Sequence, residues 1–190
     1  PDPPAYVRTT TLEYQCTGKS TATMNAILSN ASAASVQARI VDARVANDKG
    51  TWVTGTSTAG AEGSNETVFD FVVPKQEDGY YQIAELKIWD VMEVDSNGNS
   101  SIIEEDDPMY LDLTDEGIIT KVVKNAFVSF AENKSQNFTG NGFLESYTIS
   151  KDDPITMQIV DFEGEKIRYL DTDSVKITIS YAGESKKYGG

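Results

Sequence analysis

Residues 80–90 constrain the fold of this chain more than any other segment, because apolar and polar side chains alternate along them with a period of two. That period indicates a β-strand with one buried face, since successive side chains of a strand point to opposite sides. Ala84, Leu86 and Ile88 then face a core, and Trp89 lies on the opposite face. Similar alternation recurs along the chain, and no segment longer than about ten residues has the period of an amphipathic helix. The sequence therefore predicts an all-β protein.

Turn-forming residues separate the candidate strands at short intervals, which is typical of a β-sandwich. In the first half, strands are predicted near residues 7–17, 20–29, 35–45, 51–56, 67–73 and 80–90. In the second half, they are predicted near residues 118–130, 143–149, 155–161, 166–170 and 174–181. Residues 114–117 are acidic and end in glycine, which suits a short linker. We therefore expect one sandwich over residues 1–114 and a smaller one over residues 115–190.

A short motif at the start of the 80–90 strand predicts a tyrosine corner. Glu77, Gly79 and Tyr81 are spaced so that the tyrosine hydroxyl can bond to the backbone a few residues upstream. Such a bond fixes the angle at which the chain enters the strand. We therefore expect Tyr81 to donate a hydrogen bond to the preceding turn.

This stretch resembles the closing half of the bacterial immunoglobulin-like repeats found in large cell-surface proteins. The similarity is carried by Gly79, Tyr81, residues 83–90 and the turn of Asp95, Gly98 and Asn99. It covers about residues 7–113 and differs at Ile83, where antibody-type domains have a disulfide cysteine. The resemblance implies an immunoglobulin-like sandwich located outside the cell, on its surface or in its wall. Together with the chain length and the strand pattern of the second half, it leads us to expect two immunoglobulin-like sandwiches in tandem, the second one small. Such modules display binding sites or act as spacers.

The chain is strongly acidic, with 16 basic and 30 acidic residues and a formal net charge of -14. Proteins bind nucleic acids and anionic membrane surfaces through basic patches, so we expect neither as a partner. No stretch approaches the roughly 20 apolar residues that a membrane-spanning helix requires. We therefore expect no membrane insertion.

Cysteine and histidine usage limits the chemistry that the chain can perform. Cys16 is the single cysteine, so the chain forms no internal disulfide, and its phase with Leu12 and Tyr14 predicts a buried position. Histidine is absent, which removes the most common general base and a frequent metal ligand. We therefore expect no enzymatic activity, although hydrolysis by a pair of carboxylates needs no histidine.

The best candidate for a cation site is the loop that follows the 80–90 strand, and calcium is the one cofactor we consider. Asp95, Asn97 and Asn99 take the first, third and fifth positions of an oxygen-ligand calcium loop, and Asp106 takes the twelfth. Gly98 lies at the fourth position and not at the sixth, so the pattern indicates a looser site than an EF-hand. The alternative is a solvated acidic hairpin tip.

Three aromatic residues, Trp52, Trp89 and Tyr80, are the candidate ligand-binding residues. An aromatic side chain on an exposed sheet face can stack on a sugar ring or anchor a protein partner. Both tryptophans precede residue 114, and the second half of the chain has none. The alternative for Trp89 is a core position, because it is in phase with Tyr81 and Ile83 as well.

Five Asn-x-Ser/Thr sequons begin at Asn30, Asn65, Asn99, Asn133 and Asn137. With ten asparagines and 34 serines and threonines among 190 residues, chance predicts about two. The excess fits a secreted protein with polar loops, although bacterial loops rich in Asn and Ser give the same pattern without any glycan.

Taken together, these patterns predict a non-enzymatic adhesion or recognition module of a bacterial cell-surface or secreted protein. Its partner would be a protein or glycan of a host or neighbouring cell, bound through loops and a sheet face. One alternative is a carbohydrate-binding module of a polysaccharide-degrading system. Another is a structural stalk or surface-assembly subunit.

Overall fold

The computed structural model describes residue 4 and residues 6–115, 117–130, 157–168, 176–181 and 184–189. All regular structure in this part of the chain is β-strand, which confirms the all-β prediction. It contains no helix, and therefore none long and apolar enough to cross a membrane. The chain divides into a first unit, residues 1–124, and a second unit, residues 125–190.

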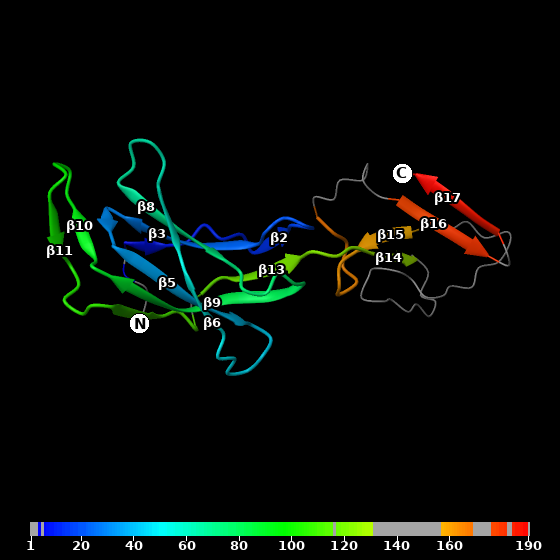
Figure 1. The fold of residues 1–190 in the computed structure, drawn as a ribbon, viewed down its shortest axis with the longest axis horizontal. Helices are drawn as coiled ribbons and strands as arrows, with labels where there is room; N and C mark the ends of the chain where they lie inside the picture. The colour runs from blue at the N-terminus through cyan, green and yellow to red at the C-terminus, as the bar shows by residue number, and fades with distance from the viewer. Residues whose placement is uncertain are drawn as a thin grey trace. The chain divides into compact units, whose positions relative to one another are not determined.

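The first unit is built from two facing sheets (Figure 1). The four-stranded sheet has the order β1-β3-β8-β7, with β1 at Val7–Arg8, β3 at Thr23–Ser29, β8 at Glu66–Val72 and β7 at Thr56–Ala59. The six-stranded sheet has the order β2-β13-β9-β5-β6, with β2 at Tyr14–Cys16, β13 at Ile119–Val123, β9 at Gly79–Trp89, β5 at Ser35–Asp42 and β6 at Thr51–Thr54. Its sixth strand, β12 at Met109–Asp112, pairs with β9.

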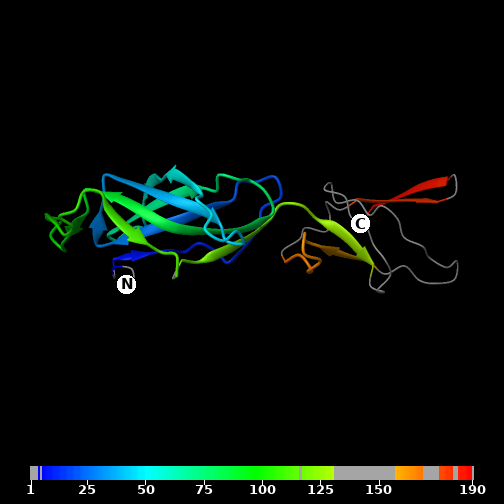
Figure 2. The same ribbon diagram turned by 90° about the horizontal axis from the view of Figure 1, so that it is seen from below.

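A small third sheet closes one end of this sandwich-like body. It joins β4 (Ala31–Ser32), β10 (Met92–Val94) and β11 (Ser100–Ile102) in the order β11-β10-β4. The hairpin of β10 and β11 projects beyond the ends of the two larger sheets, as both ribbon views show (Figures 1 and 2).

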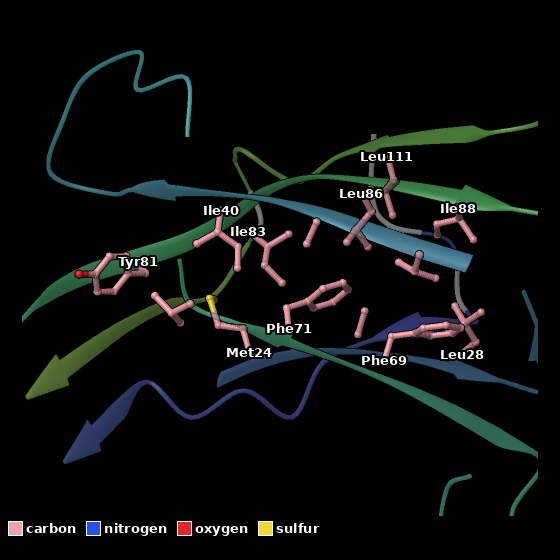
Figure 3. Packing of buried hydrophobic residues seen from close by; sticks show 14 of the residues in the cluster. Met24, Leu28, Ile40, Phe69, Phe71, Tyr81, Ile83, Leu86, Ile88 and Leu111 are labelled. Atoms are coloured by element: carbon pink, nitrogen blue, oxygen red, sulfur yellow. The ribbon is translucent and has the colours of Figure 1, made fainter. Parts of the chain in front are cut away.

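The core lies between the two larger sheets and follows from the period-two alternation. Met24, Leu28, Phe69 and Phe71 point inward from the four-stranded sheet toward Ile40, Ile83, Leu86 and Ile88 of the six-stranded sheet (Figure 3). The predicted inward residues Ala84, Leu86 and Ile88 are buried, while Trp89 is half-buried. Burial of these alternating apolar side chains is the main favourable contribution to folding.

Strand β2 departs from the prediction, because Leu12 is 66% exposed and Cys16 is also exposed. Leu12 precedes β2, and β2 has three residues at the edge of its sheet, so the core does not extend over it. Partial burial and the carboxylate of Asp78 raise the pKa of the Cys16 thiol. The thiol is therefore protonated at neutral pH.

The division between the units falls after Lys124 and not after Thr114, where the sequence predicts it. Strand β13 belongs to the first unit, because it pairs antiparallel with β9 and parallel with β2. The predicted linker lies in the sequence between β12 and β13, and both of these strands pair with β9, so it does not separate two units. Lys124 secures the end of the unit, since its ammonium donates to the carbonyl of Ser20 at 2.6 Å.

In the second unit the structure describes two separate antiparallel pairs. Strand β14 (Phe127–Phe130) pairs with β15 (Met157–Val160), and β16 (Lys176–Tyr181) pairs with β17 (Glu184–Gly189). Strand β17 was not expected from the sequence. The strand predicted at residues 143–149 lies outside the described residues, so a second sandwich stays a prediction.

The predicted tyrosine corner is present. The Tyr81 hydroxyl donates to the carbonyl oxygen of Glu77 at 2.9 Å, and the side chain is 4% exposed. Burial, with the carboxylates of Glu77 and Asp42, raises the pKa of this hydroxyl, so that it remains a donor at neutral pH. The bond connects the turn before β9 to the strand that carries the core residues.

We expect Tyr81→Phe to lower the free energy of unfolding by about 0.5–1.5 kcal/mol, because the carbonyl of Glu77 loses its donor while the ring stays in the core. Tyr110→Phe is the matched control, since Tyr110 is 59% exposed. Urea unfolding of the three proteins measures the change. Identical midpoints for Tyr81→Phe and wild type would contradict a stabilising corner.

Gly55 marks the point where the chain passes from β6 in one sheet to β7 in the other. A Cβ atom at this position would lie 2.8 Å from Cε1 of Phe71 and 3.1 Å from Cβ of Phe69. Its N–H donates to the carbonyl of Val36 at 2.9 Å, which holds the backbone in place. The crossing therefore requires a residue without a side chain.

We expect Gly55→Ala to destabilise the first unit by about 1–3 kcal/mol, because the added methyl group overpacks the core beside Phe71. Ser57→Ala, at an exposed position of β7, is the control and should change stability little. Thermal unfolding followed by circular dichroism measures both. A Gly55→Ala protein that melts with the wild type would show that the two phenylalanines can move aside.

Candidate recognition surface

The outer face of the six-stranded sheet is crossed by two rows of paired residues. One row runs Trp52–Arg39–Glu85–Asp112, and the other runs Thr54–Gln37–Lys87–Tyr110, through β6, β5, β9 and β12 in that order. Directly paired residues lie on the same side of a sheet. Their neighbours Ala38 and Leu86 are buried in the core, so both rows face outward.

Lys87 lies between two aromatic side chains of this face. Its ammonium nitrogen is 4.2 Å from the centroid of the Trp52 ring and 5.6 Å from that of Tyr110. A cation over an aromatic ring is attracted to the electron-rich face of that ring. Lys87 therefore connects an aromatic residue of β6 to one of β12 across the two strands between them.

An ion pair lies in the neighbouring row. Nε of Arg39 is 3.2 Å from a carboxylate oxygen of Glu85, and their side chains are 24% and 28% exposed. At this exposure the pair contributes little to stability. It fixes the position of one positive and one negative group beside Trp52, which is paired with Arg39.

Tyr80 and Trp89 lie on the same outer face, toward opposite ends of β9. Arg44 and Lys121 each place their charged groups 5.7 Å from the centroid of the Tyr80 ring. Trp89 is paired with Ser35 and is half-buried, like Tyr80 and Trp52. Trp89 lies nine positions after Tyr80, a span of about 30 Å at roughly 3.3 Å per residue. One small ligand therefore cannot contact both of them.

The outer face of the four-stranded sheet has a different composition. Phe69 and Phe71 of β8 point into the core, so the residues between and beside them face outward. The outward residues of β3, β7 and β8 include Thr23, Asn25, Thr56, Thr58, Val68, Asp70 and Val72. Among the strands described in the first unit, outward aromatic side chains lie on the six-stranded sheet.

The predicted calcium ligands lie on two segments. Asp95, Asn97 and Asn99 form the β10–β11 turn, and Asp106 lies between β11 and β12. One carboxylate oxygen of Asp95 accepts the backbone N–H groups of Asn97 and Asn99, each at 2.9 Å. Within the described residues, no group of three or more His, Cys, Asp or Glu side chains is placed to hold a metal ion. The calcium site stays a prediction from the spacing.

The sequence identifies Trp52, Tyr80 and Trp89, and the structure places all three on one sheet face. The sequence alone does not identify Tyr110, Lys87 or the Arg39–Glu85 pair, because their cross-strand partners depend on the strand order. The alternation within β9 does carry a signal for Lys87, which is outward with Trp89. Comparisons with family models, with curated proteins and with solved structures found no match for this chain.

The calcium prediction is tested with Asp95→Asn, which keeps an acceptor oxygen for the two N–H groups and removes the charge. Calcium that binds the folded loop should raise the melting temperature of the wild type at millimolar concentration, by mass action. Asp95→Asn should melt like the wild type without calcium and lose the rise. A wild-type melting curve that calcium leaves unchanged would return this loop to a solvated hairpin tip.

Proposed function

We propose that the first unit is an immunoglobulin-like recognition module without enzymatic activity, and that a protein partner binds the outer face of its six-stranded sheet. The strand orders support the first part. Immunoglobulin-like sandwiches pair strands A-B-E-D in one sheet and G-F-C in the other, with C′ beside C in the variable type. The orders β1-β3-β8-β7 and β13-β9-β5-β6 correspond to these, and the Tyr81 corner lies on the strand equivalent to F.

The observation that carries the second part is the Trp52–Lys87–Tyr110 group. Tyr110 is 59% exposed, and Trp52 is half-buried beside the Arg39–Glu85 pair. Tryptophan, tyrosine and arginine are the residues most enriched at binding hot spots of protein interfaces. The contacts with Lys87 also restrict the rotamers of Trp52 and Tyr110 before a partner binds. These two side chains then lose less conformational entropy on binding.

A protein partner fits this face better than a sugar does. Stacking of a sugar requires a free aromatic face, and the Lys87 ammonium lies over the ring of Trp52 at 4.2 Å. The aromatic residues are also spread along the whole of β9, a span that suits a protein surface. The carbohydrate-binding module remains the second candidate, because Tyr110 keeps most of its surface exposed.

Display outside the cell, at its surface or in its wall, belongs to the same proposal and rests on the resemblance to bacterial surface repeats. The partner would then be a protein of a host or neighbouring cell. The second unit would be a smaller sandwich of the same kind. A stalk or assembly subunit would need no such arrangement of aromatic and charged groups on one face, so a face without any partner would favour that alternative.

Photo-crosslinking from the full chain tests the proposed face. We expect a photoreactive phenylalanine at position 110 to crosslink a defined protein on target cells, and the same probe at Thr58, on the other sheet, to give no product. At concentrations well below saturation, where the yield follows the affinity, Trp52→Ala should reduce the yield at least tenfold, which corresponds to about 1.4 kcal/mol of binding free energy. Crosslinking from both sheets, or a yield unaffected by Trp52→Ala, would contradict the proposal. Binding on a glycan array that Tyr110→Ala removes would favour the carbohydrate candidate.

A further inference from the structure

Three of the sequons, at Asn30, Asn65 and Asn99, lie in the described part of the chain, and all three asparagines are exposed. Asn30 lies between β3 and β4, Asn65 directly precedes β8, and Asn99 lies in the β10–β11 turn. Asn133 and Asn137 lie outside the described residues. An Asn-x-Ser/Thr acceptor has to be accessible, and turns and loops provide that access.

Backbone hydrogen bonds place these three asparagines at the same end of the first unit. The N–H of Asn30 donates to the carbonyl of Asn65 at 2.8 Å, and the N–H of Val94 donates to the carbonyl of Asn30 at 2.9 Å. The next residue, Asp95, donates to the carbonyl of Asn99 at 3.0 Å. The three sequon asparagines are therefore neighbours around the small sheet that closes this end, although they are far apart in sequence.

The side-chain amides of these residues differ from that of Asn25, which is not part of a sequon. The Asn25 amide group donates to the hydroxyl of Thr10 at 2.8 Å, and its oxygen accepts from Thr9. For Asn30, Asn65 and Asn99 the described residues show no bond of this kind for the side-chain amide nitrogen. Their amides are thus available at the surface.

The strands of the six-stranded sheet contain no asparagine in their described sequences. Modification at the end of the unit would therefore leave the sheet face with Trp52 and Tyr110 without an attached group. Three observations therefore bear on modification: the asparagines are exposed, sequons are more frequent than chance predicts, and the described ones gather at one end away from that face. None of these observations depends on what the face binds.

We propose that this end of the first unit is a glycan cluster, with N-linked oligosaccharides on Asn30, Asn65 and Asn99. The donor class is an oligosaccharide linked to a polyprenyl phosphate or diphosphate. The amide Nδ2 forms a bond to the anomeric carbon, the bond from that carbon to the phosphate oxygen breaks, and the amide loses one proton. The lipid phosphate leaves with the electron pair, and no oxidation or reduction takes place.

The hydroxyl of the third sequon residue gives a matched test that leaves the asparagine in place. This matters at Asn30, whose φ of 52° lies in the left-handed region that asparagine tolerates better than most residues. At Asn99, Ser101→Ala removes the sequon, whereas Ser101→Thr and Ser100→Ala keep it. Ser32→Ala removes the sequon of Asn30, and Thr67→Ala removes the sequon of Asn65.

The full chain and these variants, produced in the cells that naturally make it, are digested and analysed by mass spectrometry. We expect glycopeptides at two or three of the asparagines in the wild type. The Asn99 glycopeptide should disappear in Ser101→Ala and persist in Ser101→Thr and Ser100→Ala. Unmodified peptides at all three sites, or at two of them, would overturn the cluster. Modification of Asn99 that survives Ser101→Ala would overturn sequon-directed transfer.

Discussion

Strand β9 pairs with β5 along one edge and with β12 and β13 along the other, and the rest of the first unit depends on this arrangement. Its inward side chains, among them Leu86 and Ile88, fill the centre of the core. Its outward side chains include Lys87 and Trp89, which belong to the candidate recognition surface. The turn that precedes β9 is held by the hydrogen bond from the Tyr81 hydroxyl to the carbonyl of Glu77. Core and surface are thus set by the register of one strand.

A bulge at Ala84 decides which side chains of β9 reach that surface. Arg39 of β5 pairs with Glu85 and Ile40 pairs with Ile83, so Ala84 has no direct partner on β5. Ile83 and Ala84 are both buried, which shifts the phase by one residue. Without the bulge, the phase set by Tyr81 would point Lys87 and Trp89 into the core. Trp89 therefore lies on the outer face, and its alternative core position, which follows from the phase of Tyr81 and Ile83, is wrong because the bulge intervenes.

Local signals in the sequence predicted the local features of the fold. The tyrosine corner depends on residues within one turn, and the burial of Leu86 and Ile88 depends on alternation within one strand. The end of the first unit was missed, because residues 114–117 have the composition of a linker and lie instead between two strands that share β9 as a partner. The group of Trp52, Lys87 and Tyr110 joins three strands, so it follows only from the strand order, which no local pattern contains.

The parallel pairing of β2 with β13 has a mechanical consequence. Strand β2 lies near the beginning of the first unit and β13 lies at its end, and the two run in the same direction with Lys121 opposite Tyr14. Tension between the two ends of the unit pulls parallel strands in opposite directions along their axes. The hydrogen bonds between them are then loaded together in shear, not broken one after another as in unzipping. Such a geometry suits a chain that has to stay folded while it transmits a pulling force.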